Sequence, residues 1–100
     1  MLENLFPLLM CPYCGENPEK GLELHTLESS DQKSGKRINN GVIYCQNCTR
    51  FFLIQDEILS MLLDNVREKG DELLFLSKWR TKLPEYITLK AKPFNLKENQ

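Results

Sequence analysis

Two short segments, Cys11-Pro12-Tyr13-Cys14 and Cys45-Gln46-Asn47-Cys48, contain every cysteine of this 100-residue chain. Each segment holds two thiols one tight turn apart, a spacing at which both sulfur atoms can bind the same ion. Two such pairs make a tetrahedral site that leaves no position for a catalytic water, so the segments predict a structural zinc site and a scaffold rather than an enzyme. The predicted Zn²⁺ ligands are Cys11, Cys14, Cys45 and Cys48.

Three other uses of these cysteines remain open: a different thiolate-bound metal or cluster, two disulfides, or a thioredoxin-like redox pair. Residues 1–10 carry an acidic Glu3, no basic flank and an apolar run broken by Pro7, which is unlike a secretory signal peptide. We therefore expect a cytoplasmic protein, and disulfides are rare in that compartment. A redox pair would occur once, at the start of a helix, whereas two copies with Pro or Asn between the thiols favour metal knuckles.

The apolar pattern predicts an α+β fold with a small zinc-ribbon-like antiparallel sheet, an N-terminal helical turn and a C-terminal helix. Residues 22–28 alternate between apolar and polar side chains until Leu27, as in a half-buried strand, whereas residues 51–54 are apolar throughout. Thirty residues (15–44) separate the cysteine pairs, more than a two-knuckle ribbon needs, so we expect an insertion. Within one domain (1–100) the predicted parts are the ribbon (1–28 and 41–63), a polar insertion loop (29–40), a helix (71–83) and an extended tail (84–100).

Apolar residues recur every three or four positions in the predicted C-terminal helix, at Leu73, Leu76, Trp79 and Leu83. Such a stripe is typical of a helix that packs one face against a core. Asp71 suits the N-cap position, and Pro84 ends the helix because its ring and missing N–H cannot continue the hydrogen-bond ladder.

Charged side chains are nearly balanced, with 13 basic and 14 acidic residues. Nucleic-acid affinity grows with the number of phosphates neutralised, so we expect RNA to be contacted only indirectly, within a complex. The cluster Lys33, Lys36 and Arg37 is more typical of a solvated loop. His25, the only histidine, is expected at an exposed strand position rather than as a metal ligand or general base. No apolar run approaches the roughly 20 residues of a membrane span, so no membrane partner is expected.

Two apolar runs, residues 51–54 and 58–63, follow one another closely. A chain of this size cannot bury both runs on every side. We therefore expect another protein to cover part of this surface. An added edge strand would supply main-chain hydrogen bonds that depend little on sequence, and the adaptable side chain of Met61 would suit several partners.

Longer stretches around the cysteines resemble one protein family; they are LLMCPYC (8–14), GVIYCQNCTRFFLIQDEI (41–58), ML (61–62) and FLSKWRTKLPE (75–85). They resemble the small zinc-ribbon activator subunit shared by several S-adenosylmethionine-dependent methyltransferases, in particular its archaeal branch. The resemblance covers nearly the whole chain. The knuckles alone are unspecific, and the specific part is the second knuckle followed at fixed distance by the aromatic-apolar strand, the QDEI turn and ML.

The resemblance implies a non-catalytic subunit that binds several class I methyltransferases, one at a time, and keeps each soluble and able to bind its methyl donor. Those enzymes modify tRNA, rRNA or a translation termination factor, and S-adenosylmethionine would be bound only through the partner. Residues 58–63 match a segment that adds an edge strand to the partner's sheet. At Leu59 the chain departs from the family's usual proline, which restores a backbone N–H there. The expected partner-binding residues are Phe52, Ile58, Leu59, Met61 and Leu62.

Two other functions compete with this interpretation. A nucleic-acid-binding zinc ribbon predicts salt-sensitive binding of RNA or DNA by the isolated chain. A thiol oxidoreductase predicts a reactive thiol of low pKa, which metal ligation would mask.

Overall fold

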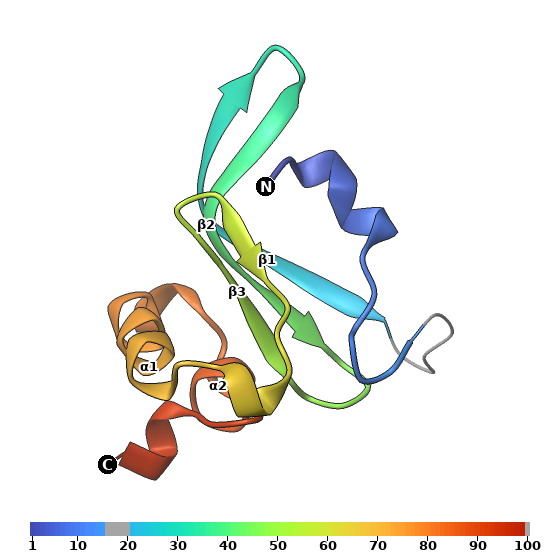
Figure 1. The fold of residues 1–100 in the computed structure, drawn as a ribbon. Coiled ribbons are helices and arrows are strands. Elements are labelled where there is room, and N and C mark those ends of the chain that lie inside the picture. The colour runs from blue at the N-terminus through green and yellow to red at the C-terminus, as the bar shows by residue number, and fades with distance from the viewer. Residues whose placement is uncertain (16–20, 100) are drawn as a thin grey trace.

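A four-stranded antiparallel sheet lies at the centre of the computed structural model, which describes residues 1–15 and 21–99 (Figure 1). The sheet order follows the chain and comprises β1 (Leu22–Gln32), β2 (Gly35–Cys45), β3 (Phe51–Gln55) and β4 (Ile58–Ser60). The helical elements are η1 (Glu3–Leu8), η2 (Asp64–Val66), α1 (Lys69–Lys78), η3 (Arg80–Lys82), α2 (Glu85–Thr88) and η4 (Leu96–Asn99). These elements confirm the predicted α+β fold with its N-terminal helical turn and its helix near the C-terminus.

Strand β3 is buried on both faces, as its unbroken apolar run predicts. Phe51, Phe52, Leu53 and Ile54 are all buried, and neighbouring side chains of a strand point to opposite faces of the sheet. A polar turn then leads into β4, and Asp56 and Glu57 have φ values of 50° and 72° there. Two successive positive φ values are what a tight two-residue hairpin turn requires.

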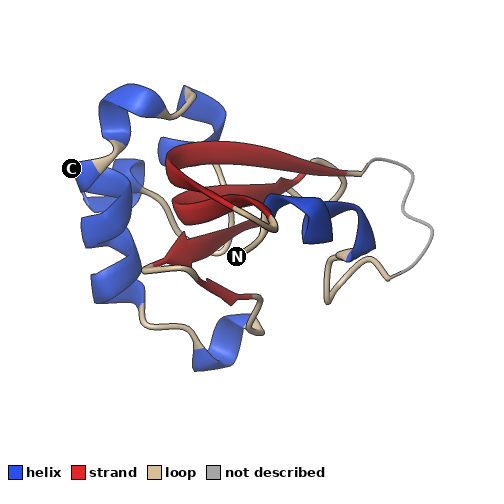
Figure 2. Ribbon diagram, turned by 90° about the horizontal axis from the view of Figure 1, so that it is seen from above, coloured by secondary structure: helices blue, strands red, loops and turns tan. Residues whose placement is uncertain are grey.

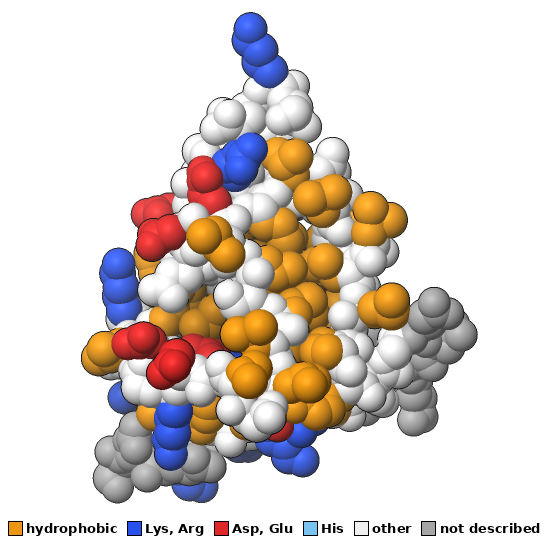
Figure 3. Space-filling view, viewed as in Figure 1, with side chains coloured by type: hydrophobic (Ala, Val, Ile, Leu, Met, Phe, Trp, Pro, Cys, Tyr) orange, Lys and Arg blue, Asp and Glu red, His pale blue; other side chains and the backbone are white. Residues whose placement is uncertain are grey.

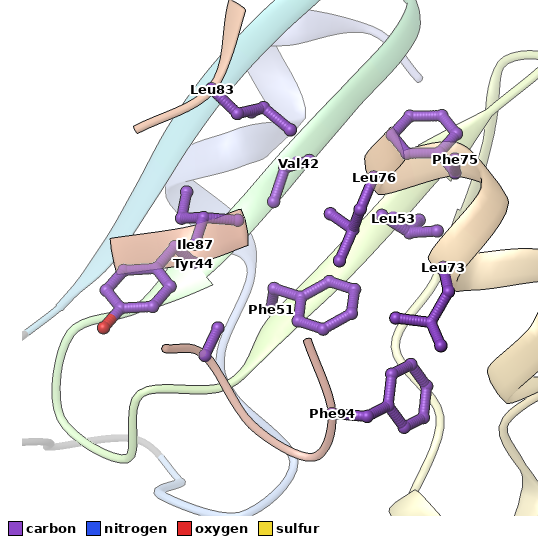
Figure 4. Close-up of a cluster of buried hydrophobic side chains, with 11 residues drawn as sticks. Val42, Tyr44, Phe51, Leu53, Leu73, Phe75, Leu76, Leu83, Ile87 and Phe94 are labelled. Carbon is purple, nitrogen blue, oxygen red and sulfur yellow. The ribbon is translucent and has the colours of Figure 1, made fainter. Parts of the chain in front are cut away.

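One face of the sheet packs against the C-terminal half of the chain to form the helix-side core (Figure 4). Figure 2 shows the C-terminal helices and the N-terminal turn separated by the sheet. The predicted apolar residues pack here: Leu73 and Leu76 of α1 are buried in this core and Trp79 packs against it. Leu83 is also buried, but α1 ends at Lys78 and Leu83 follows the separate turn η3, so one continuous helix to Pro84 does not form. The buried members of the helix-side core are Val42, Tyr44, Phe51, Leu53, Leu73, Phe75, Leu76, Leu83, Ile87, Ala91 and Phe94.

In the described part of the chain, the opposite face is covered mainly by the N-terminal segment, which forms the N-terminal-side core together with the cysteines, while Met61 packs against it after β4. This cover is thin: Phe6 and Leu9 pack against it, while Leu8 is 78% exposed. One face of the sheet therefore has a thick helical layer and the other has a single strip of chain. The buried members of the N-terminal-side core are Met1, Cys11, Ile38, Ile43, Cys45, Phe52 and Ile54.

The prediction of an insertion loop at 29–40 is wrong, because these residues continue β1 and β2 into a long hairpin. Pairing runs from Ser29 opposite Ile38 to Gln32 opposite Gly35. Backbone pairing builds this extension, and its mostly polar side chains give no period-two signal, although Ile38 is buried and Arg37 pairs with Glu57. The break in alternation at Leu27 is a real feature, since the register shifts between Thr26 and Glu28.

The predicted helix boundaries and tail also need correction. Helix α1 begins at Lys69 with Glu68 at its N-cap, so Asp71 lies in the first turn, where its charge favours the helix dipole, rather than at the cap. Within the predicted tail, residues 84–99 are not simply extended: α2 forms there, and the Lys92 carbonyl accepts a hydrogen bond from the Phe51 amide (3.1 Å). Residues 16–20 of the predicted ribbon lie outside the described residues.

The segment between β4 and α1 buries one charged side chain, Arg67, which is 1% exposed. Its guanidinium forms a forked ion pair with Glu72 and lies over the rings of Phe51 (4.6 Å) and Phe94 (5.4 Å). Pairing and aromatic stacking offset the cost of removing this charge from water. Arg67 thereby joins the segment after β4 to both α1 and the helix-side core. Among the described residues, no helix has the length and apolar character needed to cross a bilayer.

Gly41, which pairs with Thr26 at the register shift between β1 and β2, allows the register of the sheet to be tested. A Cβ there would lie 2.8 Å from the His25 carbonyl oxygen and 3.2 Å from Ile38 Cγ2. We expect Gly41→Ala to destabilise the metal-loaded protein by about 1–3 kcal/mol in chemical denaturation, because the contact with backbone cannot relax easily.

Gly70→Ala is the matched control, since a Cβ in that part of α1 meets open space and removes a helix-disfavouring glycine. The control should be neutral or slightly stabilising. A Gly41→Ala protein as stable as the control would show that β1 and β2 do not approach each other as described.

Candidate metal centre

Four sulfur atoms converge where the N-terminal segment meets the turn between β2 and β3. The first cysteine pair follows η1, and the second begins at Cys45, the last residue of β2. The Sγ atoms of the four cysteines all lie within 4.8 Å of one another. The shorter contacts join the two pairs: Cys11 to Cys48 at 3.6 Å and Cys14 to Cys45 at 3.7 Å. The four predicted ligands are therefore positioned to hold one metal ion.

The geometry of this cluster fits a tetrahedral zinc site. With Zn–S bonds of about 2.3 Å, the sulfur atoms of a regular tetrahedron lie about 3.8 Å apart. The two contacts between the pairs match this spacing and are far longer than the roughly 2 Å of a disulfide bond. All four cysteines are free thiols. Four soft sulfur donors favour zinc over hard cations such as magnesium or calcium.

The backbone forms the same turn at both cysteine pairs. After the second cysteine of each pair, Gly15 (φ 75°) and Thr49 (φ 60°) adopt a left-handed conformation. Their amides donate to the carbonyls of Cys11 (3.0 Å) and Cys45 (2.8 Å). Glycine adopts this conformation easily, whereas for the β-branched Thr49 it is costly and must be held by the surrounding structure.

Electrostatics within the cluster favour a cation. Burial raises the pKa of the Cys11 thiol to about 12 and also raises the pKa of Cys45. Burial acts on Cys48 too, but hydrogen bonds from the side chain and backbone of Arg50 outweigh it and lower the Cys48 pKa to about 7. Four thiolates in so small a volume repel one another unless a metal ion replaces their protons. A bound Zn²⁺ would supply that charge and release protons as it binds.

Groups outside the ligand set hold the two pairs together. The Asn47 side-chain amide donates to the sulfur of Cys14 (3.2 Å), so the second pair contacts a ligand of the first. The guanidinium of Arg50 lies 3.7 Å from the centre of the Tyr13 ring and also forms an ion pair with Asp64. Such outer contacts commonly tune metal affinity. The cysteine spacing identified the ligands, and Tyr13 and Asn47 lie within the same two segments. Their contacts with the other pair, and the pairing of Arg50 with Asp64, are not encoded by that spacing.

His25 lies on β1, as predicted, although α2 covers it more than an exposed position implies. Its side chain is 22% exposed, hydrogen-bonds Glu23 and faces the Tyr86 ring edge-on at 6.3 Å. Hydrogen bonds from Tyr86 and His25 to Glu23 overcome the opposing effect of burial and lower the pKa of this carboxyl. The contacts among Glu23, His25 and Tyr86 therefore join α2 to the sheet. His25 is not one of the four clustered residues that could bind a metal ion.

The five residues expected to contact a partner lie in different surroundings. Ile58 is 68% and Leu62 is 46% exposed, whereas Leu59 and Met61 pack partly against the N-terminal-side core. Phe52 is fully buried beneath them, so the prediction that it contacts a partner directly is corrected. Phe52 lies on a central strand, paired with Ile43 of β2, and its side chain belongs to the N-terminal-side core against which Leu59 and Met61 pack.

Comparisons of the chain with protein-family models, with curated proteins and with solved structures found no match. A function for this chain is therefore inferred from its own residues and their geometry, and the class of its partner from the sequence resemblance alone.

If the four sulfurs hold one zinc ion, elemental analysis of protein purified without chelator should give one zinc per chain. Cys45→Ser should lose most of this zinc and much of the folded ribbon, because a buried ligand is removed from a site that holds two distant segments together. Denatured wild-type protein should titrate with four free thiols. Less than half a zinc per chain, or a disulfide between the two pairs, would contradict the assignment.

Proposed function

We propose that this chain is a non-catalytic, zinc-binding subunit that binds class I methyltransferases and activates them. Its partners would be enzymes that methylate tRNA, rRNA or a translation termination factor, in line with the family that the sequence resembles. The observation that carries the proposal is that β4, an edge strand, presents its unpaired side beside exposed apolar side chains. S-adenosylmethionine would then be bound by the partner alone.

The free edge of β4 supports docking by strand addition. Residues Ile58 to Ser60 pair with β3 on one side, and β4 ends the sheet order, so its other side has no strand partner within the described part of the chain. An unpaired edge is a template for another strand. Position 59 is leucine rather than proline, so all three residues of β4 keep an N–H group. Natural proteins usually protect such edges, and this one is short but not blocked by proline.

The β4 surface, formed by Ile58, Leu59, Met61, Leu62 and Leu63, supplies the apolar part of the proposed contact. Figure 3 shows hydrophobic side chains gathered across the middle of the face that carries the β3–β4 hairpin and η1. Exposed apolar side chains on and beside an edge strand, here led by Ile58, Leu62 and Leu63, are typical of protein–protein contacts. Its flexible methionine could adapt to several related partners.

A shallow hollow beside β4 adds polar groups to this contact. It has a volume of about 180 Å³ and lies between the edge strand and the start of α1. Ser60 and Leu62 line one side, while Glu68 and Asp71 line the other. A partner strand carrying basic side chains would fit this edge, because opposite charges across an interface favour correct association. Only one partner could occupy the edge at a time.

A nucleic-acid-binding role has weaker support. The tip of the β1–β2 hairpin carries exposed Lys33 and Lys36, but Arg37 forms a salt bridge with Glu57 (3.7 Å), and Asp31 pairs in register with Lys36. Acidic groups therefore offset this basic cluster. RNA would be contacted only within the complex with an enzyme.

The charge balance predicts that the isolated zinc-loaded chain binds tRNA weakly at physiological salt. We expect no saturation at micromolar protein in a fluorescence-anisotropy titration, because few phosphates can be neutralised. Sub-micromolar binding that is lost at high salt, and weakened by Lys33→Glu with Lys36→Glu, would favour the nucleic-acid-binding alternative instead.

The β4 surface predicts the outcome of charge substitution. Ile58→Lys combined with Leu62→Glu should leave zinc content and folding intact, since both side chains are largely exposed. The pair should weaken binding to a methyltransferase that co-purifies with the native protein by several kcal/mol, roughly 100-fold or more, because desolvated charges would lack partners. Methyl transfer and S-adenosylmethionine binding by that enzyme should fall in parallel.

Leu74→Glu is the matched control, because Leu74 is an equally apolar, 70% exposed residue on α1, outside the β4 surface. The control should bind and activate like the wild type. Full activation of the enzyme by the folded Ile58→Lys, Leu62→Glu protein would rule out this interface.

A further inference from the structure

Three residues from distant parts of the chain, Tyr13, Arg50 and Asp64, form a cluster that we name the clamp. Arg50 Nε lies 3.2 Å from both carboxylate oxygens of Asp64, and Arg50 Nη2 lies 2.9 Å from Oδ2. The same guanidinium lies 3.7 Å from the centre of the Tyr13 ring. The Tyr13 hydroxyl in turn accepts a hydrogen bond of 2.7 Å from the backbone amide of Asp64. Each member of the clamp therefore contacts both of the others.

The contacts within the clamp are of a kind that holds geometry closely. A planar guanidinium that forks onto a carboxylate fixes distance and orientation together, which a lysine could not do. Stacking of the same guanidinium on the Tyr13 ring restrains its position perpendicular to the guanidinium plane as well. The hydrogen bonds from Arg50 keep the pKa of the Asp64 carboxyl below its usual value, so the pair stays charged at neutral pH.

The position of the clamp along the chain gives it two neighbours. Tyr13 lies between Cys11 and Cys14, and Arg50 follows Cys48 by two residues, so two members are attached to the two cysteine pairs. Asp64 directly follows Leu63, the last residue of the β4 surface. The clamp thus lies between the metal centre and the surface proposed to bind a partner.

The path of residues 61–63 is held at both ends. Before them, Ser60 pairs with Leu53 in the sheet. After them, the contacts of Asp64 with Tyr13 and Arg50 provide the second anchor. The side chains of Leu62 and Leu63 are 46% and 49% exposed, so packing fixes their direction only in part. Loss of the second anchor would loosen this stretch of backbone.

We propose that the clamp couples the metal centre to the β4 surface, with Tyr13, Arg50 and Asp64 acting as positioning residues. Closure of the cysteine pairs around zinc brings Tyr13 and Arg50 together, and the joined pair fixes Asp64 and the end of the β4 surface. The coupling is reciprocal, so contacts that hold Asp64 also slow the release of zinc. Only the naming of residues 58–63 as a docking surface rests on the proposed function.

The test uses the full-length zinc-loaded chain without any partner and measures two quantities. The first is the rate of zinc transfer to a chromophoric chelator, and the second is hydrogen exchange at the Asp64 amide, followed by NMR. Arg50→Gln should release zinc about 10–100-fold faster, the range expected when an outer contact of a metal site is removed. Tyr13→Phe keeps the ring but removes the hydroxyl, so it should speed exchange at Asp64 at least about 10-fold and also accelerate zinc release.

Arg37→Gln is the matched control, because it removes another arginine–carboxylate pair, with Glu57, that does not touch the cysteines. The control should stay within about twofold of the wild type in both quantities. Exchange at Ile43, in the buried part of β2, should stay unchanged in every variant and reports that the core is intact. If Arg50→Gln fails to fold, Tyr13→Phe still decides the outcome, since Tyr13 is partly exposed and loses only one oxygen.

Zinc release and Asp64 exchange that both rise in Tyr13→Phe would support the clamp. The proposal is overturned if either quantity stays within about twofold of the control in that folded variant. Neither measurement involves a methyltransferase, so a negative result would leave the proposed function standing. Conversely, a chain that binds no methyltransferase could still show the coupling.

Discussion

The meeting of two cysteine pairs at one point is the constraint on which the rest of the structure depends. One pair lies in a strip of chain with little regular structure, and the other lies between two buried strands. Binding of structural zinc to small modules contributes about 10–16 kcal/mol, as much as the whole stability of a typical domain. At its first residue this strip is held by Met1, which is buried and forms backbone hydrogen bonds with Ile38 and Glu57. Near the cysteines, without a metal ion, only partly buried side chains such as Leu9 would hold it to the sheet.

This constraint explains why the two faces of the sheet differ. Helices and the C-terminal segment cover the helix-side core without help from a metal, and the buried Arg67 attaches the segment after β4 to them. The N-terminal-side core has a thinner cover, which is joined to the sheet at the cysteine cluster. Apolar side chains therefore remain exposed on this face (Figure 3). An exposed apolar surface whose backbone is held in one conformation is suited to binding other proteins.

Sequence reasoning succeeded where one physical signal dominated. The cysteine spacing predicted the clustered sulfurs, the unbroken run 51–54 predicted a strand buried on both faces, and the stripe that includes Leu73 and Leu76 predicted a packed helix. It failed for the hairpin at 29–40, because backbone pairing there needs no apolar alternation. It also failed for the tail, where isolated apolar residues such as Ile87 gain their contacts only from a sheet far away in sequence.

The candidate site was predictable only in its ligands. The clamp and the burial of Phe52 follow from the register of the strands and from contacts across 14 to 51 residues of chain, which no local pattern encodes. Burial itself is a cooperative property of the fold, so an apolar residue next to an exposed one can belong to the core. The proposed β4 surface accordingly leaves out Phe52, which the sequence grouped with exposed apolar residues.

The central claim is that a metal-held scaffold presents the edge of β4 to a methyltransferase, and hydrogen exchange of a purified complex tests it most directly. The account predicts that backbone amides of residues 58–63 gain protection when the enzyme binds, while those at the β1–β2 hairpin tip, residues 32–36, do not change. Protection confined to the hairpin tip or to α1, with residues 58–63 exchanging as in the free chain, would contradict it.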